Sequence, residues 1–125
     1  MLDSGLLISW GEIYPGREEH ALLRLFSEVV AYGGKLVEEG RISGFEPFVV
    51  RARGGDLRDL RGFMIIRGTR EQMTTLRHDD AFLAYVERAK KLMNRVGVDE
   101  LYLGEELRHI LEPFESRVAR SRSPA

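Results

Sequence analysis

Apolar residues alternate with other residues in the first part of the chain, and this alternation predicts a β-strand over Leu6–Tyr14. Pro15 and Gly16 then end the strand, because proline cannot donate a ladder hydrogen bond and glycine relaxes the backbone. The alternation assigns residues to the two faces of the strand: Leu6, Ile8, Trp10 and Tyr14 on one, Leu7 and Ile13 on the other.

From Arg17 to Gly40 the apolar residues recur every three or four positions, which predicts an amphipathic helix. Gly33 and Gly34 lie inside it, and each glycine costs a helix interior about 1 kcal/mol relative to alanine. Either the helix breaks there, or it approaches a neighbour too closely for a Cβ atom. Gly40 is expected to end the helix. The predicted apolar stripe consists of Leu22, Leu25, Phe26, Val29, Tyr32, Gly33 and Leu36.

Three further strands are predicted, over Phe45–Ala52, Gly62–Arg67 and Val98–Leu103. Pro47 places the first of them at a sheet edge or gives it a bulge. The charged segment Arg53–Arg61, with two glycines in it, is expected to join the first two of these strands as a long hairpin.

Helical patterns lie between the last two strands and after them. Thr69 and Gln72 form a capping-box pattern, and Asp79 or Asp80 can cap a second stretch that Gly97 would end. After the last strand we expect a helix from Glu105 up to Pro113, and a flexible tail over residues 117–125. The second stretch carries its apolar stripe on Phe82, Val86, Ala89, Met93 and Val96.

The element order βαββαβ predicts a ferredoxin-like α+β fold, with a four-stranded antiparallel sheet and two helices on one face. The length of 125 residues suits one domain, which we place at residues 1–116. The strands over Leu6–Tyr14 and Gly62–Arg67 are apolar on both faces, so one row would face water in a lone domain. A second copy packed sheet to sheet would cover it, which predicts a homodimer.

The composition of the chain restricts the classes of partner and of chemistry that we expect. The net charge is −1, from 19 basic and 20 acidic residues, so we expect neither a nucleic-acid nor a membrane partner. RNA-recognition domains also need exposed stacking aromatics, and Phe63 is expected to be buried. The chain has no cysteine, which excludes thiolate nucleophiles and cysteine-based metal sites. The N-terminus lacks the pattern of a signal peptide, so we expect a cytoplasmic protein.

Four segments together resemble a known superfamily: Pro15–Glu18 (PGRE), Gly62–Gly68 (GFMIIRG), Thr69–Phe82 (TREQMTTLRHDDAF), and the final strand from Val96 into Leu103-Gly104-Glu105. Over residues 5 to about 115 the chain resembles the dimeric α+β-barrel superfamily of ferredoxin-like proteins, in particular its short bacterial members. The resemblance implies the fold and a dimer. The superfamily includes cofactor-independent monooxygenases, lactone isomerases and haem enzymes, which share no common set of residues, so it implies no catalytic residue here.

The three histidines are the candidates for acid–base chemistry near neutral pH. His20 would project from the first turn of a helix towards a cleft, or simply be exposed. His78 stands beside Asp79 and Asp80, which would make it a general base, unless the aspartates cap the next helix. His109 lies four residues after a glutamate, which is too few ligands for a good metal site, so we expect no metal. All three lie in polar sequence that does not suit a haem ligand, and we expect no cofactor.

Aromatic and basic residues suggest a pocket for a small apolar or aromatic ligand. The candidate ligand-binding residues are Trp10, Tyr14, Arg17 and Tyr102, with Tyr85 and Arg67 as further members. Packing in the core or in a dimer interface explains the same aromatic residues without a ligand. Two functions therefore stay open. One is a small-molecule-binding module without a strong catalytic signature, and the other is a cofactor-independent monooxygenase or isomerase with His78 or His20 as its catalytic residue.

Overall fold

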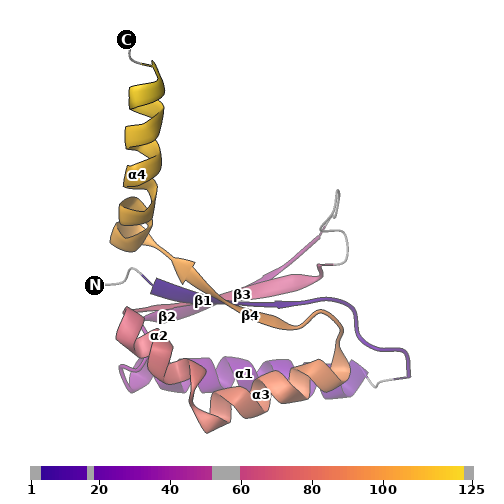
Figure 1. Cartoon of the computed structure of the whole chain (residues 1–125). Helices are drawn as coiled ribbons and strands as arrows, with labels where there is room; N and C mark the ends of the chain where they lie inside the picture. The colour runs from indigo at the N-terminus through magenta and orange to yellow at the C-terminus, as the bar shows by residue number, and fades with distance from the viewer. Residues whose placement is uncertain (1–3, 17–18, 52–59, 123–125) are drawn as a thin grey trace.

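The computed structural model describes residues 4–16, 19–51 and 60–122 (Figure 1). In the described part, one four-stranded sheet has the order β2-β3-β1-β4, and every neighbouring pair of strands is antiparallel. This is the ferredoxin-like α+β fold that the sequence predicts. The elements are β1 (Ser4–Trp10), α1 (Glu19–Glu38), β2 (Gly44–Val49), β3 (Gly62–Gly68), α2 (Arg70–Arg77), α3 (Asp80–Leu92), β4 (Gly97–Tyr102) and α4 (Gly104–Arg122).

The sheet has one covered face and one open face. Helices α1, α2 and α3 lie together on one side of it, whereas α4 rises on the other side, away from them (Figure 1). Because side chains alternate along a strand, the register sorts each row of residues onto one face. Leu6 pairs with Ile66 on the helix side, and Leu7 pairs with Ile65 on the open side. Both rows are apolar, as the sequence predicts.

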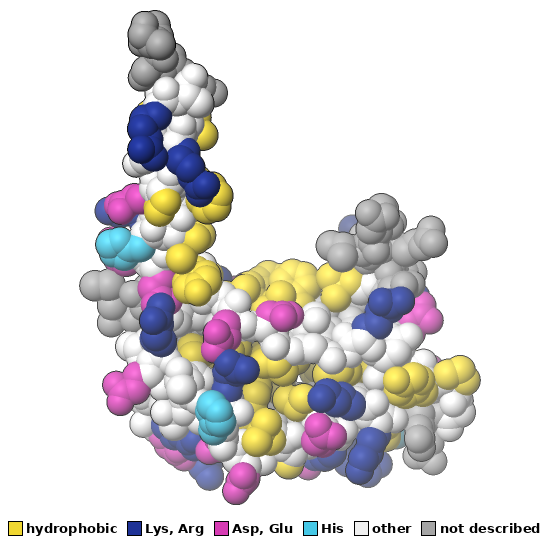
Figure 2. All heavy atoms as spheres, in the orientation of Figure 1, with side chains coloured by type: hydrophobic (Ala, Val, Ile, Leu, Met, Phe, Trp, Pro, Cys, Tyr) yellow, Lys and Arg dark blue, Asp and Glu magenta, His cyan; other side chains and the backbone are white. Residues whose placement is uncertain are grey.

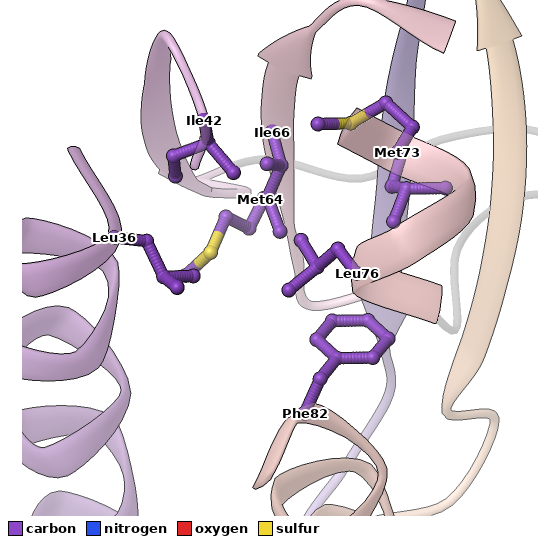
Figure 3. Close-up of a cluster of buried hydrophobic side chains, with 8 residues drawn as sticks. Leu36, Ile42, Met64, Ile66, Met73, Leu76 and Phe82 are labelled. Atoms are coloured by element: carbon purple, nitrogen blue, oxygen red, sulfur yellow. The ribbon is translucent and has the colours of Figure 1, made fainter. Parts of the chain in front are cut away.

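The core lies between the sheet and the helices (Figure 3). Leu6 is completely buried in it, and the α1 stripe contributes Leu36. Phe82 contributes from the α3 stripe, so both predicted helical stripes face the sheet. The buried cluster consists of Leu6, Leu36, Ile42, Met64, Ile66, Met73, Leu76 and Phe82.

Strand β1 is shorter at its carboxyl end than the sequence predicts. It ends at Trp10, because the next residues pair with the segment after α3 instead of with the sheet. The Gly11 N–H donates to the Asn94 carbonyl oxygen at 2.9 Å, and the Asn94 N–H donates to the Glu12 carbonyl oxygen at 2.9 Å. The alternation stops there, so the assignment of Ile13 to the face of Leu7 is wrong.

Helix α1 runs without a break through its two glycines, which decides between the two alternatives. A Cβ atom on Gly33 would lie 2.7 Å from Cε1 of Phe45 on β2, whereas one on Gly34 would meet nothing within 4 Å. Gly33 is therefore the point of close approach between helix and sheet. Gly40 follows the helix with a φ of 70°, as expected for a glycine that ends a helix.

The predicted capping residues of α2 and α3 are confirmed. Thr69 Oγ1 accepts from the Gln72 N–H at 3.1 Å and the Gln72 side chain accepts from the Thr69 N–H at 2.9 Å, which completes the capping box. Asp79, the N-cap of α3, accepts from the Ala81 N–H at 2.9 Å. The end of α3 differs from the prediction. The helix ends at Leu92 and not at Gly97, since the chain has already become extended at the next residue to pair with the segment after β1.

The C-terminal helix also differs from the prediction. Helix α4 passes through Pro113 and continues to Arg122, so residues 117–122 of the expected tail are helical. Proline removes one intrahelical hydrogen bond, the one to the carbonyl of His109. That position is exposed, so water can satisfy the freed carbonyl.

Pro47 and Phe63 are two further positions in the sheet at which prediction and structure can be compared. Pro47 lies in the edge strand β2, as predicted, because an edge strand can lack an N–H on its outer side. Phe63 is half-buried on the open face, where its ring stacks on Phe48 with centroids 4.9 Å apart. The expectation that Phe63 is buried is therefore wrong in the isolated chain.

Candidate functional site

A cavity of about 710 Å³ lies between the covered face of the sheet and helices α1 and α3. Its inner end is formed by core residues such as Leu36, Ile66 and Phe82. Its other end is lined by exposed residues, including Leu23 (65% exposed) in the first turns of α1 and Val49 (77% exposed) at the end of β2. The cavity therefore opens to solvent where β1 and β2 end and α1 begins.

The lining of the cavity is almost entirely apolar. Residues from the stripes of both helices, Val29 on α1 and Val86 and Ala89 on α3, face side chains of the sheet such as Phe45. An ion pair between Arg88 Nη2 and Glu28 Oε2 at 2.5 Å links the exposed sides of the two helices. Such an enclosure removes apolar surface from water, which favours an apolar occupant.

Trp10 lies in the cavity, and two neighbours determine its position. A Cβ atom on Gly62 would come within 2.6 Å of Cε2 of the Trp10 ring, so only glycine leaves room for the indole across β3. The Arg61 N–H donates to the Trp10 carbonyl oxygen at 3.0 Å. The Arg61 side chain forms an ion pair with Glu12, and both residues line the cavity near its open end. A charged pair thus stands beside an otherwise apolar chamber.

A second polar group adjoins the cavity on its helix side. Tyr32 lines the cavity, its ring lies 5.0 Å from that of Tyr85, and its hydroxyl donates to Asp79 Oδ1 at 3.2 Å. Asp79 Oδ2 accepts from Arg41 Nη2 at 2.7 Å. Burial, together with the Asp79 carboxylate, raises the pKa of Tyr32 to about 12. The hydrogen bond from Arg41 lowers the pKa of Asp79, so this carboxylate stays ionised and Tyr32 stays a neutral donor.

The predicted ligand-binding residues separate in space. Trp10 and Tyr85 line the cavity, but Tyr14 (41% exposed) and Tyr102 (50% exposed) do not. Tyr102 is the last residue of β4, and Tyr14 follows the end of β1. Arg17 lies outside the described residues. Arg67 lies on the open face, with its Nη1 atom 3.6 Å from Oε1 of Glu46.

None of the three histidines lines the cavity. His20 is exposed in the first turn of α1. His78 is exposed at the end of α2, with its Nδ1 atom 2.8 Å from the Thr74 carbonyl oxygen, while the neighbouring Asp79 binds Arg41 and Tyr32 instead. His109 is exposed on α4, with Nδ1 3.8 Å from a carboxylate oxygen of Glu112. Asp79, one of the two aspartates considered as partners of His78, therefore binds other groups.

Sequence reasoning did not find Tyr32 or the ion pair of Glu12 and Arg61 as polar groups of a site. Tyr32 was placed on the apolar stripe of a helix, which is correct for its ring. Its hydroxyl partner, Asp79, is 47 positions away, and Arg41 is 38 positions from Asp79. No local pattern connects such distant residues. The predicted helix cap at Asp79 was the one sequence feature that pointed to a member of this hydrogen-bonded group.

No group of three or more His, Asp or Glu side chains in residues 4–16, 19–51 and 60–122 could hold a metal ion. Among the described helices, none combines the length and the apolar character that crossing a membrane requires.

The chain is similar to known proteins in its structure. No protein-family model and no curated protein matches the chain. A dimeric ferredoxin-like protein of unknown function from Jannaschia sp. CCS1 is similar in structure, with a TM-score of 0.58 at 10% identity over 81% of this chain and 98% of that chain.

Two enzymes are also similar in structure. Hydroxynitrile lyase from Passiflora edulis has a TM-score of 0.61 at 6% identity, over 82% of this chain and 95% of that chain. SnoaB, a cofactor-independent oxygenase from Streptomyces nogalater, has a TM-score of 0.51 at 14% identity, over 84% of this chain and 97% of that chain. These likenesses show that the chain has the ferredoxin-like α+β fold, the fold that its resemblance to the dimeric α+β-barrel superfamily implies.

Proposed function

We propose that the protein is a homodimeric module that binds a small apolar or aromatic molecule in the cavity between its sheet and helices. The observation that carries this proposal is the cavity itself, whose 710 Å³ lies within the range of about 300–1,000 Å³ typical of ligand pockets. The apolar side chains that line such a cavity lack contacts that an occupied cavity would give them. A ligand would restore them.

The distribution of polar groups suggests how the ligand lies. The apolar part of the molecule would occupy the chamber between Val29 and Val86, beside the indole of Trp10. A polar substituent would point towards the open end, where Glu12 and Arg61 lie. Such an arrangement would leave the charged pair solvated, and it would spare the ligand the cost of burying a polar group.

The homodimer is supported by two observations. The open face of the sheet carries half-buried apolar residues, among them Leu7, Phe63 and Ile65. The similar protein from Jannaschia is described as dimeric. Neither nucleic acid nor a membrane is proposed as a partner, because a net charge of −1 provides no electrostatic attraction to either of them. The single domain over residues 1–116 and the cytoplasmic location belong to this proposal as well.

The alternative function is a cofactor-independent monooxygenase or isomerase. Its support is that SnoaB and the hydroxynitrile lyase are enzymes with the same fold. An enzyme of this kind would have to move a proton inside the cavity, and Tyr32 is a better placed candidate than the exposed His20 and His78. Conversion of a bound compound, lost in Tyr32→Phe, would favour this alternative.

The test is binding of an apolar fluorescent probe, 1-anilinonaphthalene-8-sulfonate, followed through energy transfer from Trp10, the single tryptophan of the chain. The double variant Val29→Trp/Ala89→Trp places two indole rings in the cavity and should weaken binding at least about tenfold. The matched control, Val30→Trp/Ala84→Trp, adds the same groups to exposed positions of the same helices. Since these variants add tryptophans, binding is scored by the emission of the probe. Equal affinity in both variants would place the probe elsewhere and overturn the proposal.

Native mass spectrometry of the purified protein tests assembly and ligand together. The proposal expects a species of twice 14.3 kDa that carries an additional small-molecule mass. The bare dimer would leave the probe experiment to decide on the ligand, and a monomer would contradict the homodimer.

A further inference from the structure

Helix α4 carries an apolar stripe that no other described residue of the chain covers. Every residue from 107 to 121 is exposed. The apolar members of the stripe are spaced at helical intervals, so they lie along one side of the helix. They are Leu107 (42% exposed), Ile110 (43%), Leu111 (43%), Phe114 (55%) and Val118 (48%).

The first turn of α4, in contrast, is attached firmly to the sheet and to α2. Ser4 Oγ on β1 donates to Glu106 Oε2 at 2.6 Å, and the same glutamate forms an ion pair with Arg70. The Leu107 N–H donates to the Leu103 carbonyl oxygen at 3.3 Å. These contacts determine the direction in which the helix leaves the sheet. The remaining turns receive no support from them.

A helix in this position is not expected to be stable by itself. Helices in proteins owe most of their stability to the packing of an apolar face rather than to helix propensity, and an exposed apolar stripe adds the cost of hydrating it. Pro113 removes a hydrogen bond as well. A helix that stood alone in solvent would be expected to be polar on all sides. The stripe therefore indicates a covering surface.

The open face of the sheet identifies the kind of covering surface. In Figure 2 the apolar side chains of α4 run along the side of the helix that faces the space above the sheet, where further apolar side chains gather. The half-buried apolar residues of that face come from all four strands: Leu7 on β1, Phe48 on β2, Phe63 and Ile65 on β3, and Leu101 on β4. Helix and sheet thus form two walls of one apolar corner.

We propose that a second copy of this chain fills this corner, so that each α4 is an arm that packs against the body of the partner. The inference rests on the proposed homodimer and goes beyond it, because sheet-to-sheet packing alone would leave the stripe in water. The arrangement is self-complementary. A two-fold axis between the sheets gives both copies the same two contacts.

The area of the two walls supports a second copy as the occupant. Five stripe residues, about half exposed and with roughly 150–200 Å² each, offer about 400 Å². A stable interface buries about 800 Å² on each partner. The stripe alone is too small for this, and so is a sheet face whose residues are already half-buried. Together they approach the required area, which favours one occupant that covers both.

The length of α4 fits this arrangement. Its 19 residues span about 28 Å at 1.5 Å per residue. Two packed sheets lie about 10 Å apart. An arm that starts at the sheet of one copy therefore extends past the sheet of the partner and reaches the level of its helices. The exposed residues Phe114 and Val118 in the later turns would lie along the partner's side.

The test compares Leu111→Glu on α4 with Leu83→Glu on α3 by sedimentation equilibrium of the full chain. The two leucines are exposed to the same extent, 43% and 44%, so the substitutions are matched in chemistry and burial. Leu111→Glu should raise the dimer dissociation constant at least about 100-fold, because each dimer contains the change twice. Leu83→Glu should leave it within about threefold. The emission of Trp10, which lies in the cavity, reports that the body of each variant is folded.

A third variant, Ile65→Glu on the open face, separates this inference from the proposed homodimer. Dissociation by Leu111→Glu and by Ile65→Glu, with no effect of Leu83→Glu, supports the arm. Dissociation by Ile65→Glu alone overturns the arm and leaves the sheet-to-sheet dimer in place. A wild-type chain that is monomeric at all concentrations overturns both. Dissociation by Leu83→Glu to the same degree also overturns the assignment to α4.

Discussion

The adjacent glycines of α1 provide a sharp test of the packing between helix and sheet. Gly33 and Gly34 are neighbours in the interior of α1, so replacing either one by alanine should raise the helix propensity by the same amount. Only Gly33 meets the sheet, since its added Cβ would lie 2.7 Å from Cε1 and 2.8 Å from Cζ of Phe45. Comparison of the two alanine variants therefore separates the effect of helix propensity from the effect of the contact with Phe45.

The two substitutions should differ in their effect on the free energy of unfolding. Gly34→Ala meets nothing within 4 Å, so it should stabilise the protein by about 1 kcal/mol through helix propensity. Gly33→Ala gains the same propensity, but it forces the Phe45 ring to move, and overpacking a core costs about 1–3 kcal/mol. The expected difference between the two variants is thus about 1–3 kcal/mol. Phe45 also lines the cavity, so its displacement should reduce probe binding in Gly33→Ala alone.

Urea denaturation, followed by far-ultraviolet circular dichroism at one protein concentration, measures the difference. A fixed concentration is needed because the proposed dimerisation would contribute to the free energy of unfolding. If Gly33→Ala were as stable as Gly34→Ala, the Phe45 ring would have moved into the cavity at no cost. The close approach of α1 to β2 would then not be the reason for glycine at this position.

Three further predictions concern the core, a cap and the charged network. Leu6→Ala, at a side chain with 0% exposure, should destabilise the protein by about 2–5 kcal/mol in urea, and a smaller loss would show that the core collapses onto the gap. Thr69→Ala should cost about 1 kcal/mol, whereas the exposed Thr74→Ala on the same helix should cost less; equal losses would contradict the capping box. The lowered pKa of Asp79 predicts stabilisation that is complete above its unfolded value of 3.8 and is lost as the pH falls through the lower folded value, and Asp79→Asn should abolish this part of the acid profile. The raised pKa of Tyr32 predicts that stability falls as the pH rises from 10 to about 12, and that the absorbance titration of the phenols loses its latest step in Tyr32→Phe.

The secondary structure could be predicted where the signal is local. The strand predicted over Gly62–Arg67, which extends to Gly68 in the structure, and the capping box at Thr69 have local signals because their residues are neighbours in sequence. Errors arose where a distant partner decides. Strand β1 ends at Trp10 because Asn94, more than eighty positions away, takes up the next residues of the backbone. No pattern around Ile13 contains that information.

The candidate site residues divide into two groups. Trp10 and Tyr85, which the sequence suggested for a ligand pocket, line the cavity, since both lie on apolar faces that turn towards the interior. Tyr14 and Tyr102 share the aromatic character, but Tyr14 follows the end of β1 and Tyr102 is the last residue of β4, and both are exposed. The charged neighbours of the cavity, Glu12 and Arg61, come from segments that only the sheet brings together.

The sequence by itself determined the periodicity of each element, and hence the kind of fold and the side of each element that faces the core. These properties depend on the spacing of apolar residues along a few turns or a few strand positions. Only the tertiary structure decided the cavity, the contact of Gly33 with Phe45 and the exposure of α4. Those properties depend on distances between elements, which result from the packing of the whole core and cannot be obtained from any one segment.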